Sequence, residues 1–134
     1  MTLRIIAYLW AAPATMLGLL AGALALVLGA RVRHVRGVLE FAGGELGQII
    51  SALPRPVAFA GITLGHVILG TTHEVLDELR EHEHVHVRQY ERWGVFLLPA
   101  YLLSSCWQAM RGRGFYSANH FEREARGARE RSDV

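Results

Sequence analysis

The sequence contains a single cysteine, Cys106, and only four prolines in 134 residues. One cysteine cannot form an intrachain disulfide, so the chain is not a disulfide-stapled scaffold. Cys106 lies in an apolar run, where a free cysteine usually behaves as a small buried hydrophobe. We therefore expect Cys106 to be buried and unreactive. A lone thiol is also compatible with a reducing compartment.

A strong charge imbalance is missing as well, because the formal net charge is only +2. This balance does not favour a nucleic-acid partner, and none is expected. The basic residues gather at positions 31–36, at 111–113 and in the C-terminal tail, where they flank apolar segments. No internal repeat is found, and a chain of this length corresponds to about one domain.

An uncharged apolar segment covers residues 5–30. About 20 apolar residues are enough for a helix to span a bilayer, so we predict a membrane-anchor helix with its basic flank in residues 1–34. The arginines at 31–36 predict that the downstream domain, residues 35–134, lies on the cytoplasmic side of the membrane. A signal peptide is disfavoured by the length of the run and its weak basic start. A buried N-terminal helix is the other alternative.

Residues 35–72 show little helical periodicity and predict two or three strands. Gly43-Gly44 is a turn signal, and a short apolar run at 57–69 ends at Gly70. We expect this last run to form one strand. His66 lies within it and is interpreted as a half-buried structural histidine rather than a ligand.

The pattern changes to a charged amphipathic helix over residues 74–93, closed by Gly94. The apolar stretch at 95–110 predicts a buried core helix or a segment that dips into the membrane. Asn119 is a plausible N-cap for a last helix over residues 121–131. Strands followed by helices predict an α+β fold with a small sheet.

The string His82-Glu83-His84-Val85-His86 is an HExxH motif on the predicted helix 74–93. Residues four apart lie on nearly the same helix face, so the imidazoles of His82 and His86 can reach one Zn²⁺ ion. Glu83 projects beside that face, where it can act as the general base without being a ligand. His84 points to the opposite side of the helix.

Catalytic zinc usually has three protein ligands, so one more is required. The downstream candidates are His120, Glu122 and Glu124, all at the start of the last predicted helix. His73-Glu74 begins a similar motif, but Asp77 stands where the second histidine would be.

The segments HEHVHVRQYERWG (82–94) and FEREA (121–125) together resemble the small gluzincin metallopeptidases. This resemblance implies a minimal zincin-like domain in which Glu122 is the third ligand, followed by the small residue Ala125; His120 is the alternative ligand. Arg126 departs from the family pattern, which often has an aspartate there to orient a histidine ligand. The orienting group would then be Asp77, Gln89 or a backbone carbonyl.

The function expected from these features is that of a membrane-anchored zinc metallopeptidase that cleaves an extended peptide. The strand at 57–69, if it forms a sheet edge near the metal helix, could pair with that peptide. Tyr116 could donate a hydrogen bond to an oxyanion, although a packed loop tyrosine is the more ordinary interpretation. The expected partners are a peptide or protein substrate and membrane lipid, whereas the sequence does not indicate an oligomeric state.

Two alternatives remain from the sequence. The metal could be purely structural and join two helices, in which case a fourth protein ligand such as His120 is expected. Alternatively, the histidines are incidental, and the chain is a small membrane interaction protein without metal.

Overall fold

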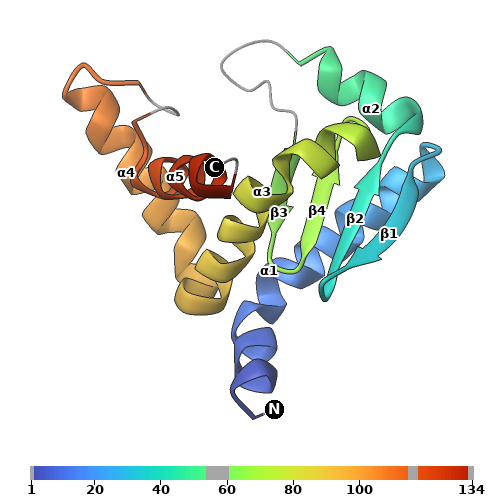
Figure 1. Ribbon diagram of the computed structural model, residues 1–134, viewed down its shortest axis with the longest axis horizontal. Coiled ribbons are helices and arrows are strands. Elements are labelled where there is room, and N and C mark those ends of the chain that lie inside the picture. Colours follow the sequence, from blue (N-terminus) through green and yellow to red (C-terminus); the bar gives the residue numbers. More distant parts are fainter. Residues whose placement is uncertain (1, 54–60, 115–117, 133–134) are drawn as a thin grey trace.

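The computed structural model describes residues 2–53, 61–114 and 118–132, which form an α+β fold (Figure 1). This fold class is the one predicted from the sequence. In chain order the elements are α1 (Thr2–Val27), β1 (Arg31–Val35), β2 (Val38–Ala42), α2 (Gly44–Ser51), β3 (Gly61–Leu64), β4 (Val67–Gly70), α3 (His73–Trp93), the 3₁₀ turn η1 (Gly94–Phe96), α4 (Leu97–Met110) and α5 (His120–Ser132).

The four strands form one mixed sheet in the order β1-β2-β4-β3. Two antiparallel hairpins, β1–β2 and β3–β4, are joined by a parallel pairing of β2 with β4. Strand β3 is therefore at one end of this strand order, and α3 begins directly after β4. The basic residues at 31–36, which the sequence suggested as a flank of the anchor, lie in β1 and its turn, and the domain boundary expected after residue 34 falls inside β1.

The sheet lies between α1 and α3 (Figure 1). Side chains of successive strand residues point to opposite faces, so each strand contributes to two cores. Phe41, Val67 and Leu69 pack with Ala25 and Ala30 on the α1 side. A second cluster on the α3 side contains Val38, Ala42, Ile68, Leu76 and Val87.

Small residues spaced three or four apart line the buried face of α1, namely Ala11, Ala14, Gly18, Gly22 and Ala25. The first two pack with Tyr90, Leu97 and Phe121, whereas the other three face the sheet. A Cβ atom added at Gly18 would lie 2.6 Å from Val67 Cβ, and one at Gly22 would lie 2.6 Å from the Phe41 ring. Glycine at these two positions therefore permits close packing of α1 on the sheet. This packing makes α1 a layer of the same unit as the sheet.

The outer side of α1 carries large apolar side chains that are exposed, including Leu9, Leu20 and Leu24. Within the described residues, α1 is the one helix that is long and apolar enough to cross a membrane. It begins at Thr2 and ends at Val27, close to the predicted segment, and it contains Pro13.

Helix α3 begins after Thr72, whose side chain accepts a hydrogen bond from the Val75 amide, and it ends at Gly94. The predicted helix and its glycine stop are therefore confirmed. The Asn119 side chain accepts a hydrogen bond from the Phe121 amide at 2.9 Å, which confirms its capping position at the start of α5.

One prediction for the middle of the chain was wrong, and one helix was missed. Residues 57–69 do not form one strand: within the described part, Gly61–Leu64 and Val67–Gly70 are two strands that form a hairpin. The only local turn signal is Gly65, which has a φ of +62°. Helix α2 was not predicted at all, because its two glycines give it low helical propensity.

Of the two alternatives predicted for residues 95–110, the buried core helix is wrong, and the segment that dips into the membrane stays a prediction. Helix α4 exposes most of its apolar side chains, among them Leu103, Trp107 and Met110. Cys106 is exposed as well, contrary to expectation. The hydrophobicity of a segment does not specify what covers it, and in the part of the chain that is described little packs on the outer face of α4.

Candidate metal centre

His82 and His86 lie one helical turn apart on the face of α3 that packs against α5. Both residues are buried, and their rings meet edge to face with centroids 5.1 Å apart. Tyr90 lies one turn further along α3 and packs in the core with Phe121 of α5. This packing of α3 on α5 holds the two imidazoles at the interface between the helices.

Glu122, in the first turn of α5, completes the cluster. Its Oε2 lies 3.0 Å from His82 Nε2, and its Oε1 lies 3.2 Å from His86 Nε2. The three potential ligand atoms all lie within 4.8 Å of one another. Two ligands bound tetrahedrally to zinc at about 2.0–2.1 Å are themselves about 3.4 Å apart. The two imidazoles and the carboxylate therefore fit such an ion with small side-chain adjustments.

Gln89 sets the proton position on His86. Its Nε2 donates hydrogen bonds to the Phe121 carbonyl and to Glu124 Oε1, both at 3.1 Å. Its Oε1 is consequently left to accept a hydrogen bond from His86 Nδ1, which lies 2.8 Å away. With the proton on Nδ1, His86 Nε2 keeps its lone pair free for a metal ion. Gln89 thus takes the orienting position for which the sequence offered three candidates.

Tyr101 of α4 is a member of the site that sequence reasoning missed. Its hydroxyl donates to Glu122 Oε1 at 2.6 Å. Asn119 links the same region, because its Nδ2 donates to the Tyr101 carbonyl at 2.8 Å and to Ser105 Oγ at 2.6 Å. No local pattern marks Tyr101, since its contact with Glu122 depends on how α4 and α5 fold back on each other.

The Glu83 carboxylate lies at the edge of the sheet, beside β3. Its Oε2 accepts a hydrogen bond from Thr63 of β3 at 2.8 Å. A Cβ atom at Gly61 would lie 3.2 Å from Glu83 Oε1, so the glycine leaves room for the carboxylate. Glu83 is buried and is not among the three clustered ligands.

The charges within the site stabilise one another. Burial alone would raise the pKa of the Glu122 carboxyl, but hydrogen bonds with His82 and His86, the charge of His86 and the Tyr101 hydroxyl lower it overall. Burial lowers the pKa of His86, whereas Glu122, the charge of Glu83 and the bond to Gln89 raise it above 6.5 overall. Glu122 is thereby favoured as a carboxylate, which is the form that can bind a metal ion.

The remaining candidate residues lie elsewhere. Asp77 is at the surface, where its Oδ1 accepts hydrogen bonds from Arg33 at 2.8 Å and from Arg80, so it does not orient a histidine ligand. His120 is exposed and does not join the cluster. Tyr116 lies outside the described residues. Glu124 is half-buried and bound to Gln89.

Two further histidines have separate environments. His66 is buried, and its Nε2 lies 2.8 Å from Glu91 Oε1. His84 is buried on the other flank of α3, with its Nε2 3.9 Å from Glu40 Oε1. Comparisons of the chain with family models, curated proteins and solved structures find no match.

Proposed function

We propose that the protein is a zinc-dependent hydrolase that cleaves peptide bonds in an extended substrate. The observation that carries this proposal is the buried group of His82, His86 and Glu122, whose ligand atoms lie within 4.8 Å of one another. The fixed tautomer of His86 supports it further, because the nitrogen facing Glu122 is the one free to bind metal.

Zinc held by these three side chains would supply a Lewis acid that polarises the scissile carbonyl and a nearby water molecule. Glu83 is the general base: its carboxylate takes the proton of the attacking water and passes it to the leaving nitrogen. Thr63 orients this carboxylate through its hydrogen bond to Oε2. Glu83 is not one of the clustered ligands, so a metal ion held there would not occupy its carboxylate.

The substrate would lie along β3. This strand is last in the strand order, and no strand among the described residues pairs with its outer side. Unpaired amides and carbonyls at a sheet edge can bind a peptide as an additional strand. Since β3 contacts α3 and holds Glu83 through Thr63, a peptide paired there would pass beside the general base.

Membrane lipid is the second proposed partner, and α1 is the proposed contact. The arginines that follow α1 favour the cytoplasmic side for the candidate site.

The cluster contains three of the protein's side chains and, among the described residues, no fourth histidine, cysteine or acid. Three protein ligands are typical of a catalytic metal site rather than a purely structural one.

Metal content and peptide cleavage of four variants test the proposal. We expect wild type to contain about one zinc per chain, and His86→Ala and Glu122→Ala to lose it, because each leaves only two ligands. Glu83→Gln should keep the metal but cleave a mixed quenched-fluorescent peptide library at least about 100-fold more slowly. His120→Ala, which changes an exposed histidine near the cluster, is the matched control and should behave as wild type.

The outcomes separate the alternatives. An active Glu83→Gln protein would remove the general-base assignment. Metal in wild type with no cleavage of any peptide would favour the structural metal site. If wild type contains no metal after growth with added zinc, the alternative of a small membrane interaction protein without metal would be favoured.

A further inference from the structure

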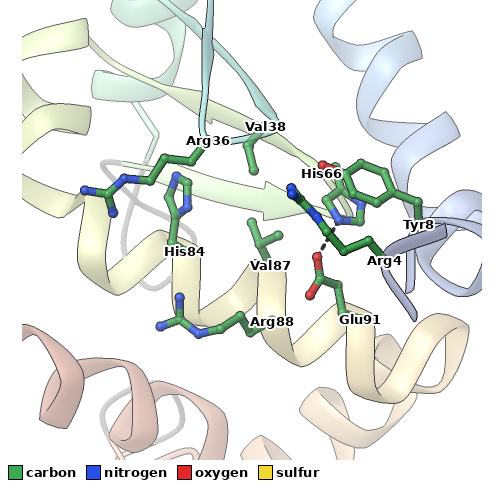
Figure 2. A pocket seen from close by; sticks show the side chains of 9 residues that line it. All are labelled: Arg4, Tyr8, Arg36, Val38, His66, His84, Val87, Arg88 and Glu91. Atoms are coloured by element: carbon green, nitrogen blue, oxygen red, sulfur yellow. Dashed lines mark hydrogen bonds and ion pairs between the residues drawn. The ribbon is translucent and has the colours of Figure 1, made fainter. Parts of the chain in front are cut away.

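A cavity lies on the flank of α3 opposite the metal centre (Figure 2). It has a volume of about 200 Å³ and forms where the N-terminal end of α1, the β1–β2 turn and the β3–β4 turn meet α3. Arg4 comes from α1, Arg36 from the first turn and Arg88 from α3. Three guanidinium groups that are distant in the sequence therefore line one small pocket.

Part of the positive charge of this pocket is uncompensated. Arg36 pairs with Glu81 at 3.1 Å, but within the described chain neither Arg4 nor Arg88 has an ion-pair partner. The one carboxylate in the lining belongs to Glu91, whose Oε1 is bound to His66 Nε2. Guanidinium groups left without a carboxylate attract an anion.

The buried residue His84 also lines the pocket. The His84 Nε2 atom is inaccessible to solvent and has no hydrogen-bond partner among the described residues. Its nearest acid, Glu40 Oε1, is 3.9 Å away, which is beyond hydrogen-bond length. Figure 2 shows the His84 ring on the same side of the pocket as Arg36 and Arg88, with Arg4 beside His66. His84 Nε2 therefore faces Glu40 rather than the open part of the pocket, and the ring closes the pocket on the α3 side.

The wall of the pocket opposite His84 is held in place by contacts within the protein. Tyr8 stacks on His66 with ring centroids 3.8 Å apart and an angle of 7° between the planes. The Tyr8 hydroxyl donates to the Gly37 carbonyl at 2.8 Å, which ties α1 to the β1–β2 turn. The His66 amide donates to Thr15 Oγ1 at 3.0 Å. These contacts hold Arg4 and Arg36 near each other.

We propose that this pocket binds a phosphate group. A phosphate monoester or diester has the compact anionic shape that guanidinium forks recognise, and the cavity is large enough for it. Two sources share this chemistry: the headgroup of an anionic phospholipid and a soluble phosphate compound. The pocket includes Arg4, the only charged residue before the apolar run of α1, so a lipid headgroup could enter it while the acyl chains stay with the apolar surface.

Two probes test the proposal and distinguish the sources: inorganic phosphate, titrated calorimetrically, and phosphatidylcholine vesicles with or without phosphatidic acid. Arg4→Gln and Arg88→Gln should each weaken the phosphate-dependent binding about tenfold, because each removes a charge-assisted contact. Arg113→Gln removes the same charge from an exposed loop and is the matched control.

Arginine-dependent binding of inorganic phosphate would identify a soluble ligand. An arginine-dependent gain from phosphatidic acid, without binding of inorganic phosphate, would identify a lipid headgroup. Binding that is equal in all three arginine variants, or absent with both probes, overturns the proposal. His86→Ala should bind the probe as wild type does, so this result is independent of the metal centre.

Discussion

The Gln89 amide decides which nitrogen of His86 can bind a metal ion. Glutamine can present either its oxygen or its nitrogen to a neighbour, and here two acceptors on α5 fix the nitrogen. The oxygen is left to face His86 Nδ1. A single side chain thus couples the position of α5, which carries Glu122, to the protonation of a ligand on α3.

We expect Gln89→Leu to weaken zinc binding about 10- to 100-fold, as is typical when a hydrogen bond to a histidine ligand is removed. Leucine fills a similar volume but can accept no hydrogen bond from His86. Zinc affinity can be measured by competition with a chromogenic chelator, with Gln48→Leu in exposed α2 as the control. Equal affinities for Gln89→Leu and wild type would show that Gln89 does not orient the ligand.

At the scale of elements, Glu40 ties the sheet to the metal helix. Its side chain is only 1% exposed, yet it binds Arg33 of β1 at 3.0 Å and Arg80 of α3 at 3.3 Å. Burial alone would raise the pKa of the Glu40 carboxyl, but the neighbouring His84, Arg80 and Arg33 lower it to about 2. A carboxyl with a lowered pKa stabilises the fold above its unfolded pKa, near 4.5.

We expect Glu40→Gln to lower the free energy of unfolding by about 3 kcal/mol at neutral pH, because it leaves two arginines without their buried partner. The stabilisation from Glu40 is lost as the pH falls from 4.5 toward 2, so the difference between wild type and variant should shrink in that range. Urea unfolding at several pH values measures it, and Glu45→Gln in α2 is the exposed control. A difference independent of pH would contradict the lowered pKa.

The elements also show what the sequence could and could not predict. Helix α3 was predicted to within one residue, because its apolar period and Gly94 are local signals. The β3–β4 hairpin was missed, since Gly65 alone marks its turn. His82 and His86 follow from spacing on one helix, whereas Glu122 was one of three downstream candidates and was selected by the family resemblance. Tyr101 was not predictable, because its contact depends on the tertiary packing of α4 and α5.

At the scale of the whole molecule, one apolar surface connects α1 with α4. Trp10 of α1 and Phe96 of η1 are both exposed and have ring centroids 6.1 Å apart. From this junction exposed leucines continue along α1 and α4, among them Leu20 and Leu102. An apolar surface of this extent on a soluble monomer is unusual and is typical of contact with a membrane or partner.

The inner face of α1 packs on the rest of the fold, so only its outer face can contact lipid. Leu20 and Leu24 lie one turn apart on that face and are 66% and 68% exposed. We expect Leu20→Glu and Leu24→Glu each to weaken binding to phosphatidylcholine vesicles at least about tenfold, because burying a leucine contributes about 1.5–3 kcal/mol. Thermal unfolding should hardly change, since neither side chain is in the core. Ile49→Glu makes the same kind of change at an exposed position of α2 and should leave sedimentation with vesicles unaltered. If all three variants sediment like wild type, the outer face of α1 is not the lipid contact, and the apolar surface must instead bind a protein.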